Sequence, residues 1–273
     1  VGQLQLLIDA CSSSVVIAGA TGGLRQAEKD GRVTSFMLED FRAILAELAP
    51  LVDFRYLSSE EEAEAELWGV QHIAEIALPA DVPRPVGLIS GGGMTCQVAY
   101  YPKGADKPAY ISIVIDLLSV FPKMKEIGVR PALAEFQARL AQRVTETGLT
   151  GQLTGTFIVI EMPGYLGDSK YPALEALGLG KRLLTKPEII PVLTAHTEAW
   201  LNETDHVNDF REAHVGILPV ELLGLLTLLD EAAKLYIRRE WQIAQGEILK
   251  PDWSLGLYVA SNRPTSISEC AVL

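Results

Sequence analysis

Three short segments of this chain contain residue types that can bind phosphate groups and hydrolyse the bond between them. The first is GATGGLR, Gly19 to Arg25, and the last is SGGGMTCQ, Ser90 to Gln97. Glycines in such turns let backbone N–H groups approach an anion closely. Between them lies the acidic segment SSEEEA, Ser58 to Ala63. Two phosphate-binding turns with a carboxylate between them predict a site for phosphoanhydride hydrolysis.

The elements that must position these segments are visible in the hydrophobic pattern. Each glycine segment follows an apolar run typical of a buried strand, at 15–18 and at 86–89. The acidic segment begins a predicted helix over 60–76, with Ser58 or Ser59 as N-cap and carboxylates in the first turn, where the helix dipole favours them. Further strands are predicted over 54–57, 97–101, 109–115 and 156–160. Further helices are predicted over 3–11, 38–48, 131–145, 187–200 and 218–241, with a turn at 163–167 and Pro219 tolerated only in a first helical turn. This alternation indicates an α/β protein.

Composition excludes several classes of protein. The chain has 273 residues, of which 48% are hydrophobic, so it can bury a large core. Its net charge of −12 argues against general nucleic-acid binding, which requires a basic face. The three cysteines are widely spaced and predict neither a disulfide framework nor a zinc site, which fits a reducing compartment such as the cytoplasm. The longest apolar stretch is too short to span a bilayer, and no signal peptide is visible.

The order of the three segments resembles the actin-like phosphotransferase superfold. The resemblance covers two branches. The boxes ATAGLR, SGEEEG and DLGGASTQ of the apyrases, which are nucleoside triphosphate diphosphohydrolases, align with Ala20–Arg25, Ser58–Ala63 and Ser90–Gln97. The SGxEEAxxxxxGV string of the exopolyphosphatase and guanosine-pentaphosphatase branch aligns without gaps on Ser58–Val70. Ile217-Leu218-Pro219 resembles the ILPG segment of that second branch, and the sequence DWSLG at 252–256 resembles the apyrase WTLG box.

The resemblance implies a role for each residue of the predicted site. Glu62 would be the general base, and Gln97 would help to hold the attacking water. Thr95 stands where the family has Ser, and Thr21 would touch the terminal phosphate or the water. The remaining phosphate-binding residues would be Gly22, Arg25, Gly92 and Gly93. The resemblance also implies polyphosphate or a nucleotide such as ATP as the substrate, with Mg²⁺ or Ca²⁺ as cofactor. These roles agree with the chemistry, because in-line hydrolysis needs a held water, a base and compensation of the developing charge.

Two departures from the family pattern leave two functions open. Ser90 stands at the metal position, where the family has an Asp that holds the divalent ion through water, so charge neutralisation would be weaker. No strand–turn of the Asp-x-Gly-Ser-Ser type precedes Gly19. The chain is therefore either a phosphohydrolase with an impaired site or a non-catalytic binding or scaffolding subunit of a larger assembly.

The implied architecture is a two-lobed actin-like (ribonuclease H-like) α/β fold whose N-terminal lobe lacks its first strands. We expect a partial N-terminal lobe over 1–115, a C-terminal lobe over 116–260 and a flexible tail over 261–273. An N-terminal lobe without those strands would leave an open sheet edge, which predicts a partner chain or an upstream segment that completes it.

Several features also allow a plain structural interpretation. The glycine segments could be ordinary strand–helix turns, and Glu60–Glu62 could be a solvated first helical turn. Trp253 could stack on a base, but packing between the lobes is the favoured reading. The four histidines show no metal-ligand spacing.

The C-terminal sequence Cys270-Ala271-Val272-Leu273 matches the pattern for geranylgeranylation. A prenyl group on Cys270 would hold the chain at the cytosolic face of a membrane. The preceding segment lacks the basic patch that usually supplies a second membrane signal. An unmodified tail on a cytoplasmic protein is the alternative.

Overall fold

A computed structural model describes most of this chain. The described residues are 16–48, 52–78, 83–91, 94–160, 182–237, 241–242, 248–249 and 253–262. The predicted helix at 3–11, the turn at 163–167, the glycines Gly92 and Gly93 and the C-terminal Cys270 all lie outside these residues. In the described part, no helix combines the length and the apolar character that crossing a bilayer requires.

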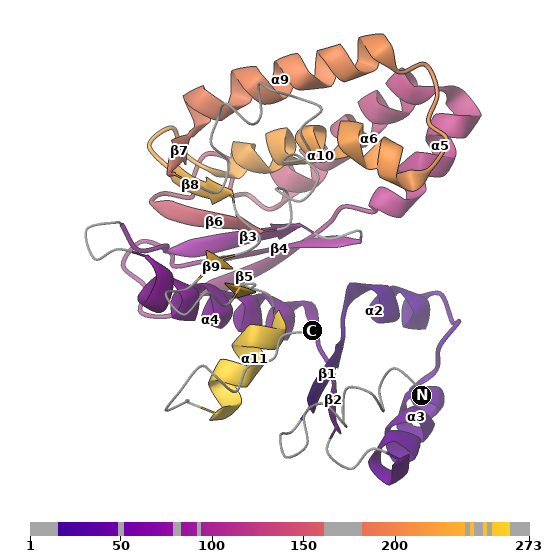
Figure 1. Cartoon of the computed structure of the whole chain (residues 1–273), viewed down its shortest axis with the longest axis vertical. Helices are drawn as coiled ribbons and strands as arrows, with labels where there is room; N and C mark the ends of the chain where they lie inside the picture. Colours follow the sequence, from indigo (N-terminus) through magenta and orange to yellow (C-terminus); the bar gives the residue numbers. More distant parts are fainter. Residues whose placement is uncertain are drawn as a thin grey trace.

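A six-stranded mixed sheet forms the larger part of the molecule (Figure 1). Its strands are β3 (Gly87–Gly91), β4 (Thr95–Tyr100), β5 (Ala109–Val114), β6 (Thr156–Ile160), β7 (Leu184–Thr185) and β8 (Lys234–Ile237). The spatial order is β5-β4-β3-β6-β8-β7. The first three strands form an antiparallel meander, whereas β3, β6 and β8 are parallel to one another, and β7 closes the edge in the antiparallel sense.

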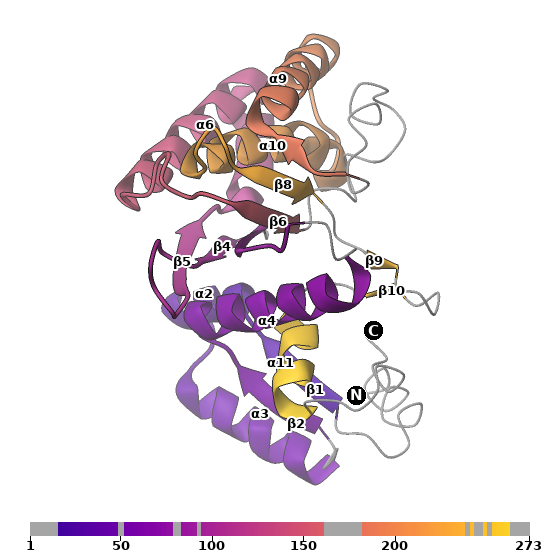
Figure 2. The same cartoon turned by 90° about the vertical axis from the view of Figure 1, so that its left-hand side faces the viewer.

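Helices cover both faces of this sheet, as Figure 2 shows. One face carries α5 (Val120–Ile127), α6 (Val129–Glu146), α9 (Lys186–Glu203) and α10 (Phe210–Leu225). The other face carries α4 (Ser59–Ala77). Neighbouring residues of β3 serve the two sides, because Leu88 packs in the cluster that contains Val70 of α4, while Ile89 packs in the cluster that contains Phe136 of α6. This burial on both faces explains why two large apolar residues, Leu88 and Ile89, follow each other in β3.

Helix α11 (Trp253–Asn262) lies directly against α4. A Cβ atom on Gly256 would lie 1.6 Å from the backbone oxygen of Ala65, so only glycine allows the two helices to approach this closely. At the start of α11, Trp253 packs against the cluster of Leu57, Ala65 and Leu257. Its ring also covers Gly19, where a Cβ atom would lie 2.3 Å from ring carbons. Trp253 is therefore a packing residue between α11 and strand β1.

The N-terminal residues form a smaller unit on the side of α4 and α11 that faces away from the six-stranded sheet (Figures 1 and 2). Strand β1 (Val16–Ala20) leads into α2 (Gly22–Lys29), then α3 (Ser35–Leu48), and returns as β2 (Val52–Tyr56). In the described residues, β1 and β2 form a parallel pair with Ala18 opposite Phe54. The two short strands β9 (Trp241–Gln242) and β10 (Ile248–Leu249) form a separate antiparallel pair.

Two sequence expectations differ from this arrangement. The lobe boundary expected near residue 115 falls just after β5, yet β3 to β5 share one sheet with β6 and β8, so the sheet extends across that point. The predicted helix over 218–241 is wrong, because α10 ends at Leu225 and β8 begins at Lys234. Pairing of β8 with β6 overrides the helical pattern of those apolar residues, which are buried in the sheet as Leu235, Tyr236 and Ile237.

Pro219 lies inside α10 rather than in its first turn. A proline cannot donate to the carbonyl four residues earlier, which here is that of Val215. The ring nitrogen Nε2 of His196, on α9, lies 3.3 Å from that carbonyl oxygen. The neutral Nε2–H tautomer of His196 therefore satisfies the acceptor that Pro219 leaves open, which explains how α10 accommodates a proline after its first turn.

Candidate functional site

The candidate site begins with the N-terminus of α4. Ser58 is the N-cap, and its hydroxyl accepts from the backbone N–H of Glu61 at 3.1 Å while the Glu61 carboxylate accepts from the backbone N–H of Ser58 at 2.8 Å. Hydrogen bonds to the Glu61 carboxyl from the Ser58 backbone and, second, from the Ser58 side chain hold the pKa of this carboxyl below its ordinary value. Glu60 and Glu61 are exposed, and Glu61 is the third helical residue, which completes the capping box with Ser58. The capping box thus fixes the helix start so that the next carboxylate, Glu62, points inward.

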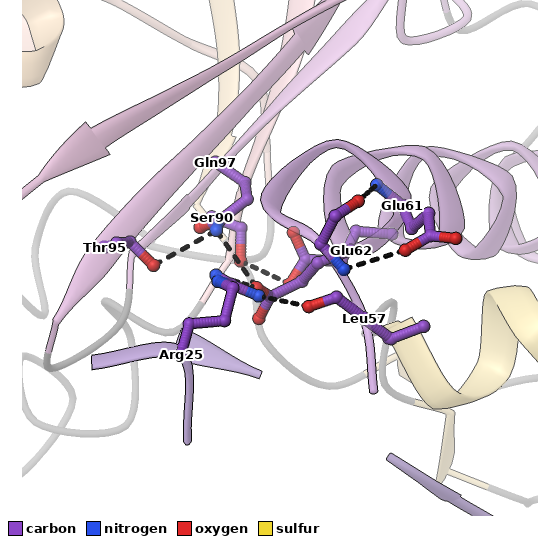
Figure 3. A network of polar contacts seen from close by, with 9 residues as sticks. Arg25, Leu57, Glu61, Glu62, Ser90, Thr95 and Gln97 are labelled. Carbon is purple, nitrogen blue, oxygen red and sulfur yellow. Dashed lines mark hydrogen bonds and ion pairs between the residues drawn. The ribbon is translucent and has the colours of Figure 1, made fainter. Parts of the chain in front are cut away.

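Glu62 is buried and joins two segments that are far apart in the sequence (Figure 3). Its Oε2 atom lies 2.7 Å from Nη2 of Arg25, on α2, and accepts from Nε2 of Gln97, on β4, at 3.1 Å. Arg25 also donates through Nη1 to the backbone oxygen of Leu57 at 2.8 Å. Arg25 therefore connects α2 to the start of α4, and Glu62 is held by a cation on one side and an amide on the other.

Strand β4 brings the second glycine segment to the same place. Gln97 Nε2 also lies 3.1 Å from the Thr95 hydroxyl, two residues earlier on the same face of the strand. A Cβ atom on Gly22 would lie 3.1 Å from that hydroxyl and 3.5 Å from Nη2 of Arg25. The first turn of α2 therefore contacts Thr95, with Thr21 preceding it as the N-cap residue. A helix N-terminus next to a hydroxyl and a guanidinium is a suitable place for an anion.

A second buried carboxylate lies one helical turn beyond Glu62. The hydroxyl of Ser90, on β3, donates to Oε1 of Glu66 at 2.9 Å. Ser90 is the register partner of Gln97 across β3 and β4, so the two contacts to α4 are neighbours on the sheet. Sequence reasoning did not single out Glu66. The signal that could have found it is its spacing of four residues from Glu62, which places both side chains on one face of the helix.

The structure thus brings together most of the predicted site residues: Thr21, Gly22, Arg25, Glu62, Ser90, Thr95 and Gln97. Gly92 and Gly93 complete the predicted set but lie outside the described residues. Their roles stay predictions. In the described part of the chain, no group of three or more His, Cys, Asp or Glu side chains is arranged to hold a metal ion. Among the described residues, the carboxylates of Glu62 and Glu66 lie at this site beside the neutral oxygens of Ser90, Thr95 and Gln97.

The fold that carries this site is the actin-like two-domain α/β fold, as the sequence predicts. More specifically, it is the fold of the Ppx/GppA exopolyphosphatase-like structures. A crystal structure of an exopolyphosphatase-like protein matches 91% of this chain and 75% of its own, at 16% identity and a TM-score of 0.58. The PPX-GPPA enzyme of Aquifex aeolicus matches 94% of this chain and 79% of its own, at 15% identity and a TM-score of 0.58.

An exopolyphosphatase from Cytophaga hutchinsonii matches 95% of this chain and 78% of its own, at 15% identity and a TM-score of 0.51. At these identities the likeness establishes the fold. No family model matches the chain, and no curated protein matches its sequence.

Proposed function

We propose that this chain is a phosphoanhydride hydrolase that acts on polyphosphate or on nucleoside polyphosphates. The observation that supports this proposal is the position of Glu62, a buried carboxylate held between Arg25 of α2 and Gln97 of β4. The first turn of α2 and Thr95 lie against each other beside it, which provides donors for a phosphate next to a base.

The proposed reaction assigns each group a step. A terminal phosphate would bind at the first turn of α2, with the Thr21 and Thr95 hydroxyls and the backbone of Gly22, Gly92 and Gly93 as donors. Arg25 would turn from Glu62 toward the phosphate, because the anion competes for the guanidinium. Glu62, released from that ion pair, would accept a proton from the attacking water, which Gln97 helps to hold. The water oxygen bonds to phosphorus as the bridging oxygen leaves with the rest of the substrate.

A divalent cation, Mg²⁺ or Ca²⁺, is part of this proposal. The groups around the site fit a hard cation, since the side chains of Ser90, Thr95 and Gln97 and the carboxylates of Glu62 and Glu66 all offer oxygen. Mg²⁺ in phosphate-transfer sites is commonly held by one or two carboxylates and the substrate phosphates rather than by a full protein cage. When bound, the cation would neutralise charge on the phosphates.

The test is phosphate release from tripolyphosphate and from ATP by the 273-residue chain, with Mg²⁺, Ca²⁺ or EDTA. Turnover that disappears in Glu62→Gln supports the hydrolase. Tight binding of these substrates without turnover would instead support the non-catalytic binding subunit, which the neutral Ser90 at the metal position favours. If the folded chain neither binds nor hydrolyses these substrates, both the hydrolase and the binding subunit are contradicted.

A further inference from the structure

Two carboxylates on one face of α4 contact adjacent strands of the sheet. Glu62 contacts Gln97 of β4, and Glu66 contacts Ser90 of β3. Both carboxylates are less than a tenth exposed, at 8% for Glu62 and 5% for Glu66. By contrast, Glu64 of the same helix accepts from the Tyr110 hydroxyl on β5, away from this group. The acidic residues of α4 are thus divided between the site and its surroundings.

Ser90, the hydrogen-bond partner of Glu66, has a hydroxyl oxygen that can also contact a ligand. Ser90 is itself only 5% exposed and is the penultimate residue of β3, and its hydroxyl donates to Oε1 of Glu66. Because the hydroxyl donates its hydrogen to Glu66, its lone pairs remain available to accept or to coordinate. Ser90 and Glu66 together therefore present oxygen ligands of the kind that hard divalent cations take, beside Gln97 and Thr95.

We propose that Glu66 is the carboxylate that faces the divalent cation accompanying the substrate phosphates, with Ser90 fixing its orientation. This inference rests on the proposed hydrolase function and deepens it. Ser90 on β3 is neutral, and Glu66 brings a negative charge to the same point from α4. In this proposal the carboxylate that faces the cation therefore comes from α4 and not from β3.

The variants needed for a test are closely matched in shape. Glu66→Gln keeps an oxygen that can accept from Ser90 but removes the charge. Glu64→Gln makes the same chemical change on the same helix, at a carboxylate that contacts Tyr110 instead. The double variant Ser90→Asp with Glu66→Gln returns one charge to the site from the strand side and keeps the total charge of the chain.

The experiment is calorimetric titration of the full chain with tripolyphosphate, in Mg²⁺ and again in EDTA. For the native chain we expect Mg²⁺ to tighten binding by at least about tenfold, since the cation would offset the repulsion between the phosphates and the Glu66 carboxylate. Glu66→Gln should lose this Mg²⁺ effect while keeping the affinity measured in EDTA. Glu64→Gln should behave as the native chain, and the double variant should recover the Mg²⁺ effect.

Several outcomes would overturn the inference while leaving the proposed function in place. An undiminished Mg²⁺ effect in Glu66→Gln would remove Glu66 from the cation site. An equal loss in Glu64→Gln would show a general charge effect of α4, and failure of the double variant to recover would show that only the packing of Glu66 matters. Absence of any tripolyphosphate binding by the folded native chain would overturn both proposals. Circular dichroism of each variant verifies that it is folded.

Discussion

The Arg25 guanidinium lies 2.7 Å from the Glu62 carboxylate, although 37 residues separate the two in the chain. Both side chains are largely buried, with 13% and 11% exposed. The ion pair is also one of the contacts that connect the N-terminal unit to α4. Because the residue proposed to bind phosphate holds the residue proposed to act as base, the proposed mechanism predicts that substrate binding releases the base.

Replacing Glu62 by Gln should lower turnover by on the order of 10²-fold or more, because the amide cannot accept the proton of the attacking water. Folding should be retained, since the amide oxygen can still accept from Arg25 and Gln97. Steady-state phosphate release from tripolyphosphate measures the effect. The matched control is Glu60→Gln, an exposed carboxylate in the same first helical turn, which should leave turnover unchanged. Equal rates for the native chain and Glu62→Gln would remove Glu62 from the mechanism.

Ser90→Asp alone should destabilise the fold by on the order of 2–4 kcal/mol, because it sets a second buried carboxylate beside Glu66. Two adjacent carboxyls share a proton, which raises their pKa in the folded chain above the unfolded value. The variant should therefore recover stability as the pH falls and lose it as the pH rises through the raised value. Thermal melts across the acidic range measure this effect. The matched control is Ser90→Asn, which has the size of Ser90→Asp but no charge, and it should show neither the loss of stability nor the pH dependence. If Ser90→Asp were as stable as Ser90→Asn, the contact between Ser90 and Glu66 would be in doubt.

Gly19→Ala should destabilise the chain by about 1–3 kcal/mol, since the added methyl group would overlap the Trp253 ring. The matched control is Gly23→Ala in α2, where a Cβ atom has no neighbour within 4 Å. That substitution should stabilise the helix by up to about 1 kcal/mol, as alanine is the better helix former. Denaturant melts followed by tryptophan fluorescence compare the two. A neutral Gly19→Ala would show that α11 does not press on β1 in solution.

Local signals in the sequence predicted much of this structure. The strand before Gly19 and the helix cap at Ser58 follow from rules that act within a few residues, whereas those rules alone would leave Glu62 in a solvated first helical turn. The family resemblance predicted the meeting of Arg25, Glu62 and Gln97, which no local rule contains.

What the sequence did not predict depends on tertiary pairing. The residues over 234–237 carry an apolar pattern that a helix could also use, and only the open position beside β6 makes them a strand. Glu66 belongs to the site because Ser90 of β3 lies opposite it, and that proximity follows from packing α4 on the sheet. Likewise, Pro219 fits within α10 because His196, on α9, donates to the Val215 carbonyl that the proline leaves without its helical donor.

The last prediction concerns two histidines, His196 of α9, which is buried, and His214 of α10, which is half-buried. Burial lowers the pKa of His196, although its hydrogen bond to the Val215 carbonyl opposes this, and burial also lowers the pKa of His214. An unfolded chain takes up protons on both residues below about pH 6.5, whereas the folded chain resists doing so. The unfolded state therefore binds more protons in that window, and stability should fall as the pH drops from about 7 toward 5.

Replacing His214 by Leu should weaken this dependence, because it removes one titrating group and keeps an apolar side chain against Phe210. His206→Gln is the matched control, since His206 is exposed and its replacement should leave the pH dependence of the melting temperature as it is. Calorimetric melts of the three chains across this range give the comparison. If His214→Leu and the native chain lost stability in parallel, protonation of His214 would play no part in acid destabilisation, and the pH response would have to come from His196 or from the carboxylates.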